Sequence, residues 1–142
     1  MGYTRDQLRA QRAYRCVKEA MGKLSEKDQE EYKIAVNHFG DNVMKNGLAL
    51  ALAFLGRQMD KRAANSLVLE HLASVEIAGL DLTTGQDVKI QEQLIQRVAQ
   101  METGNYMLAT RTYLRQIIWF RRAVQALLPT ENKKVKTDSG EA

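Results

Sequence analysis

The stretch YMLATRTYLRQIIWFRRAVQALL (residues 106–128) decides the fold of this chain. Its less polar side chains recur at alternating steps of four and three residues, which is the period of a helix that buries one face. The positions of this seam are Tyr106, Thr110, Tyr113, Ile117, Phe120, Val124 and Leu127. Pro129 follows, and proline cannot continue a helix because it lacks the backbone N–H and clashes with the preceding turn. The sequence therefore predicts one long helix that ends at residue 128.

The same stretch holds four arginines and no carboxylate. At 100° per residue, Arg111, Arg115 and Arg122 fall in a narrow sector almost opposite the seam, while Arg121 lies to one side. Aligned like charges on a helix repel one another by about 0.2–0.5 kcal/mol per pair. A face that is merely solvated usually mixes both signs. The pattern therefore favours a helix that binds an anion over one that only meets water.

Charge is segregated along the chain, although the formal net charge is only +4. Residues 1–23 hold six basic and two acidic groups, and residues 104–128 hold four basic groups and no acidic group. The segment between them, residues 24–103, is net acidic, with twelve acidic and eight basic groups. Two basic ends around an acidic centre indicate a polyanionic partner, since charge segregation concerns binding and not the fold.

Length and composition predict one all-α domain over residues 1–128, a compact bundle of five to six helices, followed by a disordered polar tail over 129–142. The chain has 142 residues, one proline and 44% hydrophobic residues, with many residues that favour helix. Cys16 has no second cysteine for a disulfide, and no leader segment opens the chain, so a cytoplasmic protein is expected. The longest apolar run, residues 47–56, is too short for the roughly 20 residues of a membrane span.

The remaining helices follow from caps and apolar spacing. Thr4 and Gln7 have the spacing of a capping box that opens a helix to about Gly22. Ser25 caps a second helix that is predicted to end at Gly40. A third starts at Asp41 and is apolar nearly all round, which predicts an element surrounded by other helices. Further helices are expected over 63–78 and 87–101, with a connecting loop over 80–86.

A search for catalytic or metal-binding patterns finds none. His38 and His71 are the only histidines, and neither lies near another soft ligand in the sequence. The segment that begins at Asp81 lacks the acidic residues at the third and fifth positions of a calcium loop, and the scattered single glycines form no phosphate-binding cluster. We therefore predict a protein that is not an enzyme and uses no metal and no cofactor.

The residues resemble a known family. One part of the resemblance is the segment Asn46-Gly47-Leu48, followed by residues 51–54 (Ala-Leu-Ala-Phe). The opening helix contributes Thr4, Gln7, Arg9, Ala13, Tyr14 and Val17. The last helix contributes Tyr106, Ala109, Thr110, Arg111, Trp119, Arg121, Arg122 and Leu127. Together these are similar to the small helical subunit of the type III-B CRISPR RNA-guided effector complex. The chain departs from the family pattern at Asn37, His38 and Gly40, where a basic pair and a proline are expected, and at Ala123, where an aromatic residue is usual.

The resemblance implies a non-catalytic subunit of an antiviral ribonucleoprotein. Several copies would stack as the minor filament, beside the backbone subunits that hold the guide RNA. Target RNA paired to the guide would be held through its phosphates without being read. The predicted phosphate contacts are Arg111, Arg115 and Arg122, and weaker candidates are Arg5, Arg9, Arg12, Lys18 and Lys45. The expected partners are guide RNA, target RNA, other subunits of the complex and neighbouring copies of this chain.

The sequence leaves two other functions open. The first is a helical adaptor whose arginines dock an acidic protein surface without direct RNA binding. The second is a regulator that reads duplex DNA with a helix-turn-helix, for which only residues 81–101 qualify. Gln91, Gln93 and Gln96 would then be the residues that contact bases.

Overall fold

The computed structural model describes residues 2–83 and 87–128, and these residues form helices and no strand. The helices are α1 (Arg5–Lys23), α2 (Glu26–Asn46), α3 (Leu48–Arg57), α4 (Ala63–Ala73), α5 (Ile90–Ala99) and α6 (Thr103–Leu127). The prediction of an all-α bundle of five to six helices is confirmed. None of the described helices is long and apolar enough to cross a membrane.

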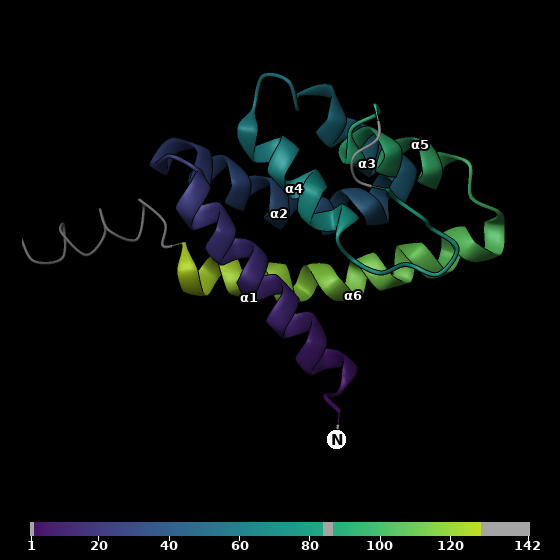
Figure 1. Ribbon diagram of the computed structural model, residues 1–142, viewed down its shortest axis with the longest axis horizontal. Helices are drawn as coiled ribbons and strands as arrows, with labels where there is room; N and C mark the ends of the chain where they lie inside the picture. Colours follow the sequence, from purple (N-terminus) through teal and green to yellow (C-terminus); the bar gives the residue numbers. More distant parts are fainter. Residues whose placement is uncertain (1, 84–86, 129–142) are drawn as a thin grey trace, which may run out of the picture.

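The long helix α6 is the base on which the other helices are arranged (Figure 1). Helix α1 crosses α6 obliquely, and its first turns project beyond the rest of the bundle (Figure 1). Helix α1 packs mainly on α6, whereas α2 contacts α3, α4 and α6, and α5 packs on α3 and α4. The predicted seam of α6 faces this core, since Tyr113, Ile117, Phe120 and Val124 are buried.

The predicted starts of the first two helices are confirmed by their caps. The backbone N–H of Gln7 donates to Oγ1 of Thr4 at 3.1 Å, and the N–H of Thr4 donates to Oε1 of Gln7 at 2.8 Å. The N–H of Asp28 donates to Oγ of Ser25 at 3.2 Å. Such bonds satisfy amide groups that have no partner in the first turn of a helix.

The predicted end of the second helix at Gly40 is wrong, because α2 continues through Gly40 to Asn46. A Cβ atom at Gly40 would lie 3.4 Å from Cγ2 of Ile117, so the glycine sits where α2 approaches α6. The buried face of α2 also continues past the glycine to Val43. The turn occurs instead at Gly47, whose φ of 88° is rarely adopted by other residues.

The prediction that other helices enclose the apolar third helix is also wrong. Helix α3 buries Leu48, Ala51 and Leu52, but Leu50 is 62% exposed and Phe54 is 59% exposed. Since α2, α4 and α5 cover only part of its circumference, α3 leaves one apolar side open to solvent.

Several boundaries differ from the predicted ones by a few residues. Helix α4 ends at Ala73 and not at residue 78, and Oγ of Ser74 donates to the carbonyl of His71 at 2.6 Å just beyond this end. A side chain that bonds nearby backbone in this way competes with the helical pattern. Helix α5 starts at Ile90, later than the predicted residue 87. The predicted tail over 129–142 and part of the predicted loop over 80–86 lie outside the described residues.

Candidate nucleic-acid interface

The outer face of α6 presents its arginines to solvent. The exposed members are Arg111, Arg115, Arg121 and Arg122. In the described part of the chain, none of them forms an ion pair with an acidic side chain. The acidic groups of residues 2–83 and 87–128 therefore form no ion pair on this face. Guanidinium groups with free N–H edges can bind phosphate oxygens in a bidentate manner.

Arg122 has a second contact, with an aromatic ring of the same helix. Its guanidinium carbon lies 4.7 Å from the centre of the Trp119 ring. Trp119 is half-buried and packs against the core. A cation over an exposed ring contributes about 0.5–1 kcal/mol. The contact orients Arg122 and occupies one face of the tryptophan, so that face is not available to stack on a base.

Apolar side chains stand among the arginines. Met107 is 60% exposed, Leu108 is 51% exposed and Ile118 is 47% exposed. Met107 and Ile118 were not among the predicted site residues, although their spacing along α6 puts them on the same side as Arg111. Arginine and methionine are enriched in protein interfaces, so this face has the composition to meet a protein as well as a nucleic acid.

The arginines of α1 are partly engaged within the fold. Nη1 of Arg9 lies 3.0 Å from Oδ1 of Asp6, and the Arg9 side chain is only 19% exposed. Nη1 of Arg12 donates to the backbone carbonyl of Ser74, just beyond α4. Arg5 is exposed and forms no ion pair with a described residue. Two of the three predicted arginine contacts of α1 thus already have a structural partner.

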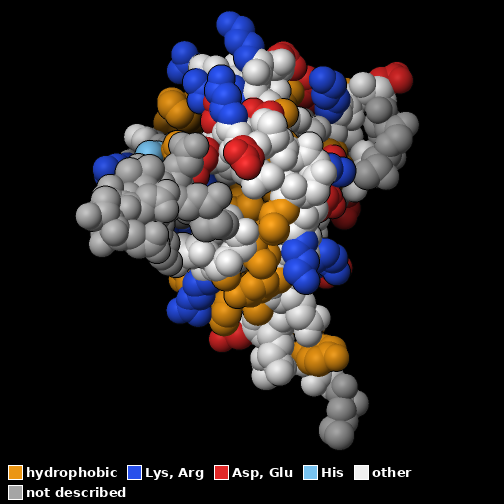
Figure 2. All heavy atoms as spheres, turned by 90° about the vertical axis from the view of Figure 1, so that its left-hand side faces the viewer, with side chains coloured by type: hydrophobic (Ala, Val, Ile, Leu, Met, Phe, Trp, Pro, Cys, Tyr) orange, Lys and Arg blue, Asp and Glu red, His pale blue; other side chains and the backbone are white. Residues whose placement is uncertain are grey.

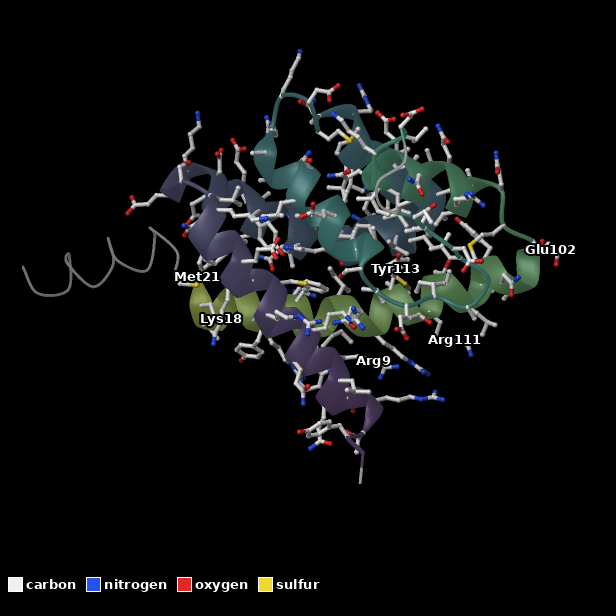
Figure 3. The ribbon with its side chains drawn as sticks, viewed as in Figure 1. Arg9, Lys18, Met21, Glu102, Arg111 and Tyr113 are labelled. Carbon is white, nitrogen blue, oxygen red and sulfur yellow. The ribbon has the colours of Figure 1, made fainter. Side chains whose placement is uncertain are left out.

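The predicted phosphate contacts do not form one surface. Figure 3 shows Arg9 and Arg111 on one side of the crossing between α1 and α6, whereas Lys18 lies on the other side of α1. The end of the molecule seen in Figure 2 shows exposed hydrophobic side chains between separate groups of Lys and Arg. Lys45 lies near the end of α2 and lines a different hollow, between α2 and α3. The structure therefore groups the α6 arginines and separates Lys18 and Lys45 from them.

Two of the three residues proposed for base reading by a helix-turn-helix, Gln91 and Gln93, are used inside the fold, whereas Gln96 is exposed. Nε2 of Gln93 donates to the carbonyls of Thr83 and Val88, each at 2.8 Å, and its Oε1 accepts from the N–H of Thr83 at 3.0 Å. Nε2 of Gln91 donates to Oγ of Ser66 at 3.1 Å. These contacts leave Gln93, which is buried, no free group for a base edge, and they argue against this alternative.

Tertiary structure also assembles a polar cluster that sequence spacing did not show. Oη of Tyr32 lies 2.7 Å from Nδ1 of His71, and Nε2 of His71 lies 3.3 Å from Oε1 of Glu19. Burial, partly opposed by Glu19, lowers the pKa of His71, and burial raises the pKa of Tyr32. The neutral ring therefore donates from Nε2 to the Glu19 carboxylate, which can only accept, and Nδ1 accepts from Tyr32.

A metal ion could be considered at the same place, because ligand atoms of Glu19, Glu70 and His71 lie within 4.8 Å of one another. A metal would need the lone pair of Nε2, which is the nitrogen that carries the proton in this arrangement. Nζ of Lys23 also lies 3.3 Å from Oε1 of Glu19. The cluster is therefore better described as a hydrogen-bonded link between α1, α2 and α4.

Comparison with known proteins identifies similar sequences and structures. The sequence model of the family described as CRISPR-associated protein (Cas_Cmr5) matches residues 5–127. The fold is similar to the crystal structure of a CRISPR-associated Cmr5 family protein from Thermus thermophilus, with a TM-score of 0.67 and 31% sequence identity. That match covers 88% of this chain and 98% of the other. A search of curated proteins finds no match.

Proposed function

Since this chain belongs to the Cmr5 family of CRISPR-associated proteins, we propose that the outer face of α6 holds RNA through its phosphates. The chain is a small subunit of a type III-B CRISPR complex. In the proposed role it stacks with neighbouring copies in a filament, beside the subunits that carry the guide RNA. The target RNA, paired to the guide, lies along α6.

One observation carries the proposal, namely that the α6 arginines have no ion-pair partner among the described residues. Arg111, Arg115 and Arg122 are exposed, and none forms an ion pair within the described residues. A phosphate between two such groups relieves their mutual repulsion and gains charge-assisted hydrogen bonds. The three side chains extend over residues 111–122, about 17 Å along the helix axis, which is enough for several phosphates.

Contacts of this kind position RNA but carry no sequence information. Gln91 and Gln93 of α5, two of the three glutamines that could have read bases, are occupied inside the fold. We propose that guide pairing alone selects the target and that this subunit strengthens its retention. We also propose that the subunit is not catalytic.

The test replaces Arg111, Arg115 and Arg122 with alanine in the reconstituted complex and measures target RNA retention against ionic strength. At about 0.7–0.9 per phosphate contact, the slope of log affinity against log salt should fall by roughly 2 to 3. A matched control replaces Lys27, Lys61 and Arg97, which are exposed and lie on other helices or turns. The control removes the same charge and should leave the slope unchanged. An unchanged slope in the α6 variant refutes the proposal.

The exposed apolar residues of the same face support a second candidate function, a helical adaptor that docks an acidic protein surface. Met107, Leu108 and Ile118 would pack against the partner while the arginines pair with its carboxylates. In that case, RNA retention would not change when the arginines are removed. Assembly of the complex from its protein subunits, after nuclease treatment, would instead fail.

A further inference from the structure

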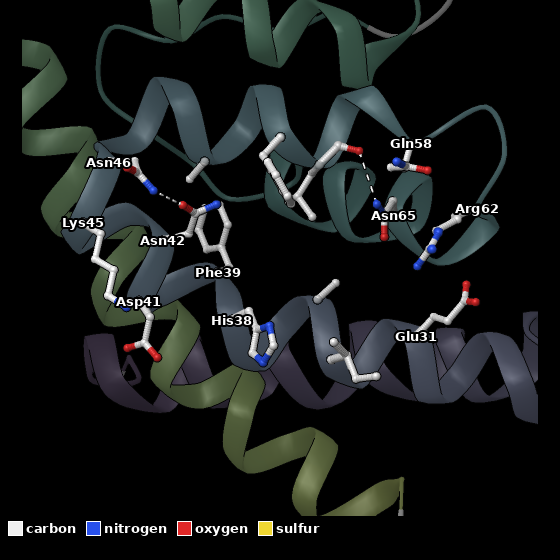
Figure 4. Close-up of a pocket in the computed structure, with 15 residues that line it drawn as sticks. Glu31, His38, Phe39, Asp41, Asn42, Lys45, Asn46, Gln58, Arg62 and Asn65 are labelled. Carbon is white, nitrogen blue, oxygen red and sulfur yellow. Dashed lines mark hydrogen bonds between the residues drawn. The ribbon is translucent and has the colours of Figure 1, made fainter.

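A hollow of about 670 Å³ lies on the side of the molecule formed by α2, α3 and the start of α4 (Figure 4). Its size falls within the range of about 300–1,000 Å³ that is usual for binding sites. Residues of α2 from Glu31 to Asn46 form one wall, and residues of α3 and α4 from Ala51 to Asn65 form the other. The arginines of α6 do not line it, so it is separate from the proposed RNA interface.

Apolar side chains form part of the lining of this hollow. Phe39 and Leu55 are buried and belong to the core, while Ile34 is 52% exposed and Phe54 is 59% exposed. Phe54 is on the side of α3 that no other helix covers. When a ligand removes such an exposed aromatic side chain from water, the free energy of binding becomes more favourable.

Four neutral amide side chains also line the hollow, namely Asn42, Asn46, Gln58 and Asn65 (Figure 4). Nδ2 of Asn46 donates to Oδ1 of Asn42 at 2.6 Å, and Nδ2 of Asn65 makes a long bond of 3.5 Å to the carbonyl of Leu55. Within the described residues, Gln58 makes no side-chain hydrogen bond, and each of the other three amides keeps at least one donor or acceptor. The hollow can therefore both donate and accept hydrogen bonds at several points along its walls.

The charges that line the hollow cancel. Glu31 and Arg62 lie at one end, and Asp41 and Lys45 lie at the other (Figure 4). Each end thus has one acidic and one basic group. A nucleic-acid strand would gain little binding affinity at such a site, because its affinity depends on an excess of positive charge.

We propose that this hollow binds an extended peptide segment of another protein subunit. The backbone of an extended chain has an unpaired N–H and C=O at nearly every residue, and the amides of the hollow match both groups. A bound helix would satisfy these groups internally and leave the amides of the hollow unused. The wall from Glu31 to Asn46 is about 22 Å long, which corresponds to roughly six to seven residues of extended chain.

The test measures binding of the full chain to overlapping synthetic peptides that cover the other subunits of the complex, with a peptide of residues 129–142 included. The double variant Asn42→Leu/Asn46→Leu removes two amides and keeps helical side chains of similar size. It should weaken the best peptide by about tenfold, which corresponds to the loss of one to two hydrogen bonds. Phe54→Ala removes an exposed side chain, so it leaves the core intact, and it should weaken the same peptide.

Two matched variants should retain full peptide binding. Met44→Ala removes a residue of α2 that is 73% exposed and does not line the hollow. The alanine variant of Arg111, Arg115 and Arg122 should also bind the peptide normally, so a failure of the RNA proposal would not be mistaken for a failure here. NMR carbon shifts of the bound peptide should indicate extended backbone.

Several results would overturn the proposal. These are the absence of any binding peptide, binding that Asn42→Leu/Asn46→Leu does not weaken, a bound peptide that is helical, and binding by the peptide of residues 129–142 alone. A single-stranded RNA probe provides the last arm. If Asn42→Leu/Asn46→Leu weakens binding of that RNA while no peptide binds, the hollow is a nucleic-acid site and not a peptide site.

Discussion

The two basic ends of this protein have the same net charge but are used differently by the fold. Residues 1–23 and residues 104–128 each carry +4. In α1, Arg9 pairs with Asp6, and Arg12 donates to the carbonyl of Ser74. In α6, none of the four arginines has an ion-pair partner among the described residues.

This difference shows that net charge alone does not identify a binding face. A cation that already bonds a carbonyl or carboxylate of its own fold must give up part of that contact to bind a phosphate. An exposed cation without such a partner loses only hydration. The α6 arginines are therefore expected to dominate binding, and the α1 arginines are expected to contribute more to stability.

The largest expected effect concerns RNA affinity. Replacement of Arg111, Arg115 and Arg122 by alanine should lower the salt slope by roughly 2 to 3, whereas replacement of Arg5, Arg9 and Arg12 should lower it by about 1 or less. Both triple variants remove the same charge, so the difference measures how available the arginines are. Filter binding of the reconstituted complex at several salt concentrations provides the measurement. If the two variants had equal slopes of log affinity against log salt, the arginines of α1 and α6 would be equally available to RNA, contrary to this prediction.

The second prediction concerns stability at low pH. It applies to the α1 side of the comparison, because Glu19 of α1 belongs to the polar cluster with His71 and Tyr32, whereas α6 contains no acidic residue. Burial lowers the pKa of His71 below its ordinary value of 6.5, so the unfolded chain takes up this proton at a higher pH than the folded chain. This contribution to stability is complete above pH 6.5 and is lost as the pH falls below it. Burial alone would raise the pKa of Glu19, but hydrogen bonds with His71 and Lys23 lower it below 4.5, which adds a further loss at lower pH.

Urea unfolding of the full chain at pH values from about 7.5 to about 5 would test this sign. The midpoint should fall toward the acid end of this range, and it should fall less in His71→Gln, which cannot take up a proton. If the urea midpoint fell equally with pH in both proteins, protonation of His71 would not be the cause of the loss of stability in acid.

The third prediction concerns the structural role of the α1 arginines. Arg12→Ala should lower the free energy of unfolding by about 1–2 kcal/mol, because a charged donor to the Ser74 carbonyl is lost. Arg111→Ala is the matched control and should change stability by about 0.5 kcal/mol or less, as is usual for surface positions. Chemical denaturation followed by circular dichroism gives both values. A larger loss for Arg111→Ala would mean that α6 also uses its arginines internally.

The smallest expected effect separates Arg122 from the other α6 arginines. Arg122→Gln should lower stability by about 0.5–1 kcal/mol through loss of its contact with Trp119, and it should alter the tryptophan fluorescence. Arg115→Gln leaves that contact in place and should show neither change. Identical spectra for the two variants would contradict the proposed orientation of Arg122.

Much of this molecule could be predicted from residues that are near one another in the chain. Helix geometry relates positions three and four apart, so spacing alone identified the buried face of α6 and the alignment of Arg111, Arg115 and Arg122 opposite it. The caps at Thr4 and Ser25 are equally local, since each bonds a backbone amide three residues on. The family resemblance in the sequence rested on such local patterns as well.

Only the tertiary structure decided the rest, because it depends on residues that lie far apart in the chain. Helix α2 passes through Gly40 because packing against Ile117 of α6 outweighs the weak helix propensity of glycine. Arg12 meets Ser74, and Glu19 meets His71, across more than fifty residues. The open side of α3 and the hollow beside it likewise follow from which helices pack together, and no periodicity within one helix contains that information.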